Sequence, residues 1–189
     1  MKKMPNIVEA DKMRKFARCE ITYEELTGGR KDVRFDECEL TLDDFIDSIE
    51  IDDYFVEFCQ FLKKNDINLV ILSDGFDLFI QKILEKNDIK NVKFYANHFL
   101  HNEDGSFSIE FPFYNPACEK KAGMCKCAMV KEQEFCYIGD GTSDLCIAQK
   151  AKILFATKSL KDYCKKHSLI HYPFNSFRDI IELLKKEEV

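Results

Sequence analysis

The feature that most constrains the fold is a short apolar run that ends in an acidic glycine turn, Phe135-Cys-Tyr-Ile-Gly-Asp-Gly-Thr-Ser-Asp-Leu145. The apolar residues predict a buried strand, and the polar turn leads into a helix that begins near Ser143. Asp140 falls at the carboxyl end of that strand, where doubly wound α/β folds bind their ligands. Its flanking glycines allow a sharp turn and a close approach to a charged ligand. Asp140 and Asp144 lie one helical turn apart and could hold a hard cation, although a capped strand–turn–helix would give the same pattern.

Strands and helices alternate along most of the chain. The most hydrophobic short run, Asn68–Ser73, predicts a buried parallel strand that ends at Ser73-Asp74-Gly75, and residues 76–85 predict an amphipathic helix. Further strands are expected at 92–95, 153–155 and 170–172, and further helices at 54–62, 126–133, 160–166 and 177–184. Residues 97–113 alternate weakly around Glu103-Asp-Gly105, which indicates a β-hairpin or an extended excursion. This alternation predicts an α/β domain with a parallel sheet covered by helices on both faces.

The first fifty residues are charged and carry few signals for strands. Short helices are expected at 10–17 and 23–26, on either side of a boundary near Gly28-Gly29, and another from Asp43-Asp44. Asn6-Ile-Val-Glu9 has only two apolar residues, too few to form a central parallel strand on its own.

Composition excludes several classes of function. Hydrophobic residues make up 46% of the 189 residues and charged residues 33%, which argues against disorder. A net charge of -6 without a basic stripe argues against a nucleic-acid partner. No apolar run has transmembrane length and none suits a signal peptide, so no membrane partner is expected. The nine cysteines fall mostly inside predicted elements, which favours reduced thiols and a cytoplasmic location.

Three separated signals together suit a phosphate site. The Ser73 hydroxyl and the backbone N–H groups of Asp74 and Gly75 could bind phosphoryl oxygens. Lys126 opens a helix after the long excursion and would supply positive charge. The carboxylate of Asp140 would hold Mg²⁺, which neutralises further charge during in-line transfer.

These residues resemble the haloacid dehalogenase (HAD) superfamily, specifically its phosphoserine-phosphatase-like branch and the MtnX-like methionine-salvage phosphatases. The resemblance lies in Val70-Ile-Leu-Ser-Asp-Gly-Phe-Asp77, Cys125-Lys126 and Tyr137-Ile-Gly-Asp-Gly-Thr-Ser-Asp144, with support from Tyr95-Ala-Asn-His98 and Tyr172-Pro-Phe-Asn-Ser-Phe177. It runs from about residue 55 to residue 184. It implies a HAD-like Rossmannoid sheet that hydrolyses a small phosphomonoester through an aspartyl-phosphate intermediate with Mg²⁺.

The resemblance also assigns roles to residues. Ser73 would be a phosphate ligand, Lys126 the catalytic lysine of the third motif and Asp140 the Mg²⁺ ligand, with Asp144 an outer or alternate ligand. Residues 1–52 would be the remnant of a helical cap and residues 53–189 the α/β core. Residues 97–122 would form a small β insertion close to a small phosphorylated metabolite.

One departure from the family is prominent. The family's first motif, Asp-x-Asp-x-Thr after a hydrophobic strand, supplies the aspartyl nucleophile, the acid/base Asp and a metal ligand, and nothing before Ser73 matches it. The best substitute, Ile7-Val-Glu-Ala-Asp11, lacks both the spacing and the strand. The missing strand would lie between those that end at Ser73 and Asp140, so both would lose ladder partners.

This departure predicts an N-terminally truncated phosphatase with little or no activity. The alternatives are a catalytically inactive HAD-like module that binds a phosphorylated metabolite or, through exposed sheet edges, a protein partner, and a nucleotide-binding Rossmann unit. The Rossmann unit is disfavoured because the sequence has no Gly-x-Gly-x-x-Gly.

Simpler interpretations remain for the individual residues. Ser73 could cap the following helix, Lys126 could be a surface lysine, and Asp74 could be an N-terminal acid that points away from phosphate. His98 and His101 could touch substrate or be solvated. Cys118, Cys125 and Cys127, with Cys136 or His98, suggest zinc, but their spacing favours reduced thiols without a metal. Substrate identity and oligomeric state stay open.

Overall fold

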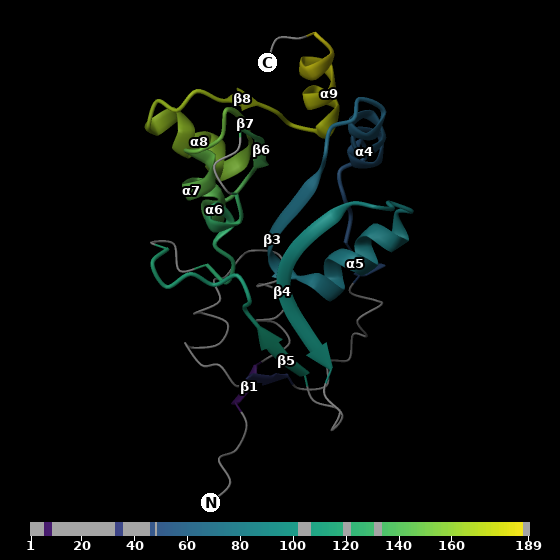
Figure 1. Cartoon of the computed structure of the whole chain (residues 1–189), viewed down its shortest axis with the longest axis vertical. Coiled ribbons are helices and arrows are strands. Elements are labelled where there is room, and N and C mark those ends of the chain that lie inside the picture. Colours follow the sequence, from purple (N-terminus) through teal and green to yellow (C-terminus); the bar gives the residue numbers. More distant parts are fainter. Residues whose placement is uncertain are drawn as a thin grey trace, which may run out of the picture. The chain divides into compact units, whose positions relative to one another are not determined.

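The computed structural model describes most of the chain from residue 46 onward and two short segments before it. The described residues are 6–8, 33–35, 46–47, 49–101, 107–118, 122–130 and 134–186. The chain divides into two compact units (Figure 1), which we describe separately: a first unit of Met1–Ile49 and Ile71–Met124, and a second unit of Glu50–Val70 and Cys125–Val189. Within the described ranges, no helix is long and apolar enough to cross a membrane.

The first unit carries a three-stranded sheet in the order β3-β4-β5. Its strands are β3 (Val70–Phe76), β4 (Lys93–His101) and β5 (Phe107–Glu110), with helix α5 (Asp77–Lys86) between β3 and β4. β4 and β5 pair antiparallel, with His98 opposite Glu110, which confirms the predicted hairpin. Rings of β3, α5 and β4 pack together: the centroid of Phe76 lies 5.5 Å from those of Phe79 and Phe99. Because these rings come from all three elements, they fix the helix against the sheet.

Several expectations about the first unit need correction. β3 does not end at Ser73 but continues through Asp74 and Gly75 to Phe76, and β4 extends beyond the predicted 92–95 to His101. Asn6–Val8, expected to be too weakly apolar for a central parallel strand on its own, forms β1 and pairs parallel with β2 (Val33–Phe35) in a separate two-stranded sheet, which does not contradict that expectation. Pairing supplies the ladder hydrogen bonds that three isolated residues could not provide. The helices expected at 10–17 and at 23–26 lie outside the described residues, as does Asp11. Of the helix expected from Asp43-Asp44, Ile46 and Asp47 are described, and both are helical.

The second unit is a parallel α/β layer, as predicted. β6 (Cys136–Gly139), β7 (Ile153–Ala156) and β8 (Tyr172–Pro173) pair parallel in that order. The helices are α4 (Phe55–Lys64), α6 (Lys126–Met129), α7 (Leu145–Ala148), α8 (Lys158–Lys166) and α9 (Phe177–Lys185), with the 3₁₀ turn η1 (Thr142–Asp144) before α7. In the part of the chain that the structure describes, β3 and β6 are each the terminal strand of their own sheet.

Successive residues of β7 enter two different cores. Phe155 packs with Phe58 of α4 and Ile180 of α9, whereas its neighbours Leu154 and Ala156 pack with Leu160 of α8. Side chains of a strand alternate between the faces of its sheet, so the two cores lie on opposite faces of β6-β7-β8. Helices therefore cover this sheet on both sides.

The compact units differ from the predicted domain boundaries. Residues 71–124 group with the N-terminal segment rather than with 125–189, and the second unit begins at Glu50 rather than at residue 53. The assignment of 1–52 to a cap and of 97–122 to a substrate-proximal insertion stays a prediction.

Candidate functional site

The turn after β6 requires glycine at its first position. A Cβ atom on Gly139 would lie 2.8 Å from Asp144 Oδ2, 2.8 Å from Tyr137 Cε1 and 2.9 Å from a methyl group of Leu160. These separations are shorter than van der Waals contact, so any side chain would displace its neighbours. Gly139 therefore lets the Asp144 carboxylate lie directly against the backbone of the turn.

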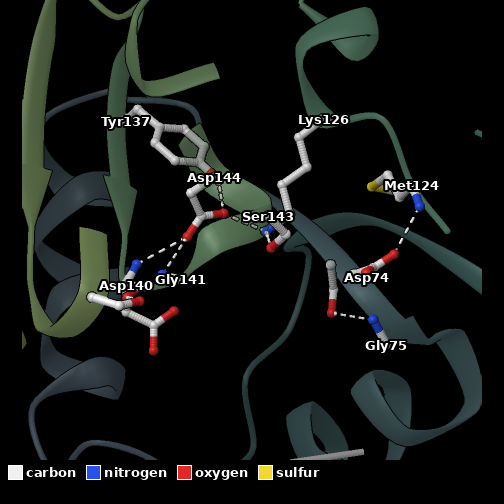
Figure 2. Close-up of polar contacts among 11 residues, drawn as sticks. Asp74, Gly75, Met124, Lys126, Tyr137, Asp140, Gly141, Ser143 and Asp144 are labelled. Atoms are coloured by element: carbon white, nitrogen blue, oxygen red, sulfur yellow. Dashed lines mark hydrogen bonds and ion pairs between the residues drawn. The ribbon is translucent and has the colours of Figure 1, made fainter. Parts of the chain in front are cut away.

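Asp144 is a buried carboxylate with donors on both oxygens (Figure 2). Its Oδ1 accepts hydrogen bonds from Lys126 Nζ at 2.5 Å and from the Tyr137 hydroxyl at 2.7 Å. Its Oδ2 accepts the N–H groups of Asp140 at 3.0 Å and Gly141 at 2.9 Å. A carboxylate offers about four lone-pair sites, so these four donors satisfy it. Asp144 thus ties the lysine to the backbone of the turn.

The surroundings of Asp144 favour its charged form. Burial alone would raise its pKa, but the nearby Lys126 ammonium and the hydrogen bonds outweigh burial and lower the pKa below its usual value. Tyr137 shows the opposite effect: burial, together with the negative charge of Asp144, raises the pKa of its hydroxyl. Tyr137 therefore stays protonated as a donor while Asp144 stays ionised.

Lys126 is the first residue of α6 and is almost completely buried, with 8% of its surface exposed. Its ammonium lies 2.5 Å from Asp144 and donates to the Ser143 hydroxyl at 3.2 Å. Buried lysines are rare unless their charge is paired, which Asp144 provides here. The structure thus excludes the simpler interpretation of Lys126 as a solvated surface lysine.

Asp140 differs from Asp144 in its exposure. Its side chain is 54% exposed, and its Oδ2 accepts a hydrogen bond from Lys158 Nζ at 2.8 Å. Its own backbone is fixed, because its carbonyl accepts the Leu160 N–H and the Ser159 hydroxyl, each at 3.1 Å. A solvent-accessible carboxylate on a fixed backbone is a suitable ligand for Mg²⁺, which binds through one or two carboxylates and keeps several waters.

The two predicted metal ligands are therefore not equivalent. Asp140 fits Mg²⁺, whereas the lone pairs of Asp144 are already taken by Lys126, Tyr137 and two backbone N–H groups. The contacts of Asp144 suit holding Lys126 and the turn in place better than direct coordination.

The predicted phosphate-binding residues Ser73, Asp74 and Gly75 lie in the first unit. The Gly75 N–H donates to Ser73 Oγ at 3.0 Å, so this amide is used locally while the serine retains its own O–H as a donor. The Asp74 carboxylate accepts the Met124 N–H at 2.8 Å, shown in Figure 2. Its carbonyl accepts Nδ2 of Asn97 at 2.7 Å, and Asn97 is fully buried. Asp74 therefore connects β3 to the segment that leads into Lys126.

The structure thus brings together part of the predicted site. Lys126, Asp144 and the backbone of Asp140 meet in the second unit, while a common phosphate site that also includes Ser73 stays a prediction. Sequence reasoning missed two residues of the site. The Tyr137 hydroxyl donates a hydrogen bond to Asp144, and the Ser143 hydroxyl accepts one from Lys126. A tyrosine inside a buried strand just before an acidic turn was the available signal for Tyr137, because a buried hydroxyl needs a partner.

The histidines and cysteines that could bind substrate or zinc have different surroundings in the structure. His98 Nδ1 lies 2.8 Å from the Asp77 carboxylate, and the side chain of His101 lies outside the described residues. Cys136, once considered with Cys125 and Cys127, is exposed on β6. Cys127 instead contacts Cys125 and Cys146, and burial, with hydrogen bonds to these two thiols, raises its pKa to about 12.

Comparison with known proteins identifies relatives of this chain. A family model described as Putative Phosphatase matches residues 32–178. The 2-hydroxy-3-keto-5-methylthiopentenyl-1-phosphate phosphatase of Bacillus pumilus (strain SAFR-032) is 30% identical over 168 residues, which cover 85% of this chain and 72% of that protein. The protein of the same name from Bacillus cereus (strain ATCC 10987 / NRS 248) is 32% identical over 151 residues, which cover 74% of this chain and 66% of that protein.

Solved structures support the fold. An apo phosphoserine phosphatase has a TM-score of 0.53 and 23% identity, with 74% of this chain and 70% of that chain covered. A phosphoserine phosphohydrolase-like protein from Francisella tularensis subsp. tularensis SCHU S4 has a TM-score of 0.59 and 21% identity, with 92% and 82% covered. At these identities the likeness establishes a shared HAD fold.

Proposed function

This chain belongs to the Putative Phosphatase family, in the phosphoserine-phosphatase-like and MtnX-like branch of the HAD superfamily, and from that membership we propose a Mg²⁺-dependent site for a small phosphomonoester. The observation that carries the proposal is the buried Lys126–Asp144 pair beside the turn that presents Asp140. The pair fixes the Lys126 ammonium group in one position, and a cationic group at a fixed position can stabilise a phosphoryl group.

Each residue has a defined part in the proposed site. Asp140 would hold Mg²⁺, which when bound neutralises negative charge on the phosphoryl oxygens. Lys126 attracts the phosphoryl group and is oriented by its hydrogen bond to Asp144. Tyr137 and the N–H groups of Asp140 and Gly141 keep Asp144 in its charged form. Ser73 would add its hydroxyl as a donor to the phosphate.

The hydrolytic step needs a nucleophile that the sequence does not offer in the family's form. No Asp-x-Asp-x-Thr precedes Ser73, and in the family that motif also supplies a metal ligand. The residues described above therefore provide the binding half of the chemistry, and hydrolysis is tested separately.

Metal binding tests the first half of the proposal. Titration calorimetry with Mg²⁺ should show one site, and Asp140→Asn should lower the Mg²⁺ affinity by about tenfold or more. Loss of a residue that hydrogen bonds to a metal ligand already costs about tenfold in affinity, and loss of the ligand itself should cost at least as much. Asp162→Asn, which removes an exposed acid from α8, is the matched control and should leave the affinity unchanged. Equal Mg²⁺ affinity in wild type and Asp140→Asn would contradict the assignment of Asp140.

Turnover tests the second half. With p-nitrophenyl phosphate and Mg²⁺ we expect little or no hydrolysis. The compound in the names of the Bacillus relatives is the first natural phosphoester to try. Robust turnover that Asp140→Ala abolishes would contradict this expectation and show that the chain hydrolyses phosphoesters without the family's Asp-x-Asp-x-Thr.

The second candidate function is a non-catalytic module that binds a phosphorylated metabolite or a protein partner. The lack of Asp-x-Asp-x-Thr before Ser73 favours it. Binding of Mg²⁺ and inorganic phosphate without turnover would support this module. Failure to bind either one would exclude the phosphatase and the metabolite-binding module, and would leave only the protein-binding module. A cytoplasmic location remains part of the proposal.

A further inference from the structure

Three cysteine side chains of the second unit converge beside Lys126. Cys125 precedes α6, Cys127 lies within α6 and Cys146 lies in α7. The sulfur atoms of Cys125 and Cys127 are 3.4 Å apart, and those of Cys125 and Cys146 lie within 4.8 Å of each other. Cys125 is therefore close to both of the other thiols. None of the three is in a disulfide.

These spacings match the requirements of a thiolate metal site. Zinc binds cysteine sulfur at about 2.3 Å, and two such bonds at the tetrahedral angle place the sulfurs roughly 3.8 Å apart. The observed 3.4 Å and the upper bound of 4.8 Å bracket that value. Movement of the Cys127 and Cys146 side chains towards Cys125 would bring all three sulfurs to one ion. A buried cysteine such as Cys164, by contrast, packs as a small apolar residue in the core with Leu154 and Leu160.

We propose that Cys125, Cys127 and Cys146 form a binding site for a borderline-soft divalent cation, Zn²⁺, which is distinct from the Mg²⁺ site at Asp140. Thiolate sulfur selects zinc over magnesium, whereas the carboxylate of Asp140 has the reverse preference. Three protein ligands leave one tetrahedral position for water or another donor.

The location of the ion suggests what it does. α6 and α7 have four residues each, which is too short for either helix to be stable by itself. Lys126 begins α6, and Asp144 immediately precedes α7. An ion bound to cysteines of both helices would fix α6 to α7 and thereby hold Lys126 against Asp144. Zinc here therefore has a positioning role and does not touch substrate.

The test measures metal content and coordination rather than activity. The full chain, purified under reducing conditions without added chelator, should contain about one zinc per chain by mass spectrometry. Replacement of zinc by Co²⁺ should give the intense thiolate-to-cobalt absorption and the visible bands of tetrahedral cobalt. Cys127→Ser and Cys146→Ser, at half-buried positions, should weaken zinc binding against a competing chelator by more than about tenfold.

Three control variants make the result specific. Cys136→Ser removes an exposed thiol of the same unit and should keep the metal and the cobalt spectrum. Cys19→Ser/Cys38→Ser removes the two thiols outside the described residues and should do the same. Asp140→Asn should retain zinc while losing Mg²⁺, which separates this site from the proposed function.

The outcomes decide the proposal. Wild-type protein that takes up neither zinc nor cobalt would overturn it, even if a cysteine variant failed to fold. So would a tetrahedral cobalt spectrum that survives both Cys127→Ser and Cys146→Ser, or one that is lost equally in Cys136→Ser. Circular dichroism on each variant establishes that lost metal is not lost structure.

Discussion

At the residue scale, the site depends on how closely Gly139 allows Asp144 to approach. The carboxylate oxygen would lie 2.8 Å from a Cβ atom at this position, while a Cβ on Gly141 would lie 3.9 Å from the same oxygen. The two glycines flank Asp140, but only at position 139 would a side chain overlap with neighbouring atoms. Gly141 has φ −120° and ψ 178°, which any residue can adopt.

This difference predicts unequal effects of alanine at the two glycines. Gly139→Ala should lower the free energy of unfolding by about 1–3 kcal/mol, because the added methyl group pushes into Asp144, Tyr137 and Leu160. Gly141→Ala is the matched control and should change it by less than about 0.5 kcal/mol. Urea unfolding followed by circular dichroism measures both. Equal losses would mean that the packing around Gly139 relaxes without cost.

The lowered pKa of Asp144 predicts how the free energy of unfolding changes in acid. Its pKa is lowered on folding, so the unfolded chain binds the proton more readily and stability must rise with pH through this range. The contribution is complete above the unfolded pKa of about 3.9 and is lost as pH falls through the lower folded value. Asp144→Asn should cost about 3–5 kcal/mol at neutral pH, because it leaves Lys126 buried without its charge partner.

The measurement is the free energy of unfolding against pH. The difference between wild type and Asp144→Asn should narrow as pH drops below about 4. Asp140→Asn removes an exposed ion pair to Lys158 and should change stability by less than about 1 kcal/mol. A gap between wild type and Asp144→Asn that stays constant down to pH 2 would argue against the ionised Asp144.

The sequence could predict Asp140 and Lys126 but not what surrounds them. Asp140 follows a recognisable strand, so its position at the carboxyl end of that strand followed from local pattern alone. The pairing of Lys126 with Asp144 joins residues 18 apart in the chain, and burial of both decides it. No local sequence pattern shows that both Asp144 oxygens accept hydrogen bonds. The sequence therefore could not distinguish a metal ligand at Asp144 from a carboxylate that holds Lys126 and the turn in place.

At the element scale, hydrophobic periodicity predicted most helices and parallel strands of the second unit, although α6, expected at 126–133, spans only Lys126–Met129. α9 was expected at 177–184 and spans Phe177–Lys185, and β7 was expected at 153–155 and spans Ile153–Ala156. The ends of β3 and β4 were wrong because Gly and Asp, which usually end strands, are held in β3 by contacts with distant residues. Asp74 bonds Met124 and Asn97, and these partners keep the strand extended through Gly75.

The start of α9 provides an element-scale prediction. The Asp179 carboxylate accepts the N–H groups of Asn175 at 2.8 Å and Ser176 at 3.3 Å, which the helix itself cannot pair. Asp179→Ala should therefore cost about 1 kcal/mol. Glu182→Ala on the same helix removes only an exposed ion pair to Arg178 and should cost about 0.3–0.5 kcal/mol. Thermal unfolding of both variants is the check, and a smaller loss in Asp179→Ala than in Glu182→Ala would contradict the capping role.

At the scale of the whole molecule, the chain order does not match the compact units. α4 comes before the first unit's sheet in sequence, yet Phe58 of α4 packs on Phe177 of α9, with ring centroids 4.9 Å apart. The Phe177 N–H also bonds the Asp52 carboxylate at 3.3 Å. Composition along the chain cannot show this, because contact between segments more than a hundred residues apart depends on tertiary packing.

The two units should therefore respond separately to damage in their cores. Phe58 and Phe76 are both almost fully buried, the first in the second unit and the second in the first unit. Either residue changed to Ala should cost about 3–5 kcal/mol locally. Hydrogen exchange measured by mass spectrometry should then rise in α4, α9 and β7 for Phe58→Ala, and in α5 and β4 for Phe76→Ala.

Ile170→Ala, at a side chain that is 91% exposed, is the control and should leave exchange unchanged in both units. If each substitution raised exchange only in its own unit, the chain would contain two cooperative units assembled from alternating segments. If Phe58→Ala raised exchange equally in β4 and α9, the separation into units would have no energetic meaning, and the chain would unfold as one body. The first outcome is expected, since aromatic contacts hold Phe58 to α9 and Phe76 to α5 and β4 within their respective units.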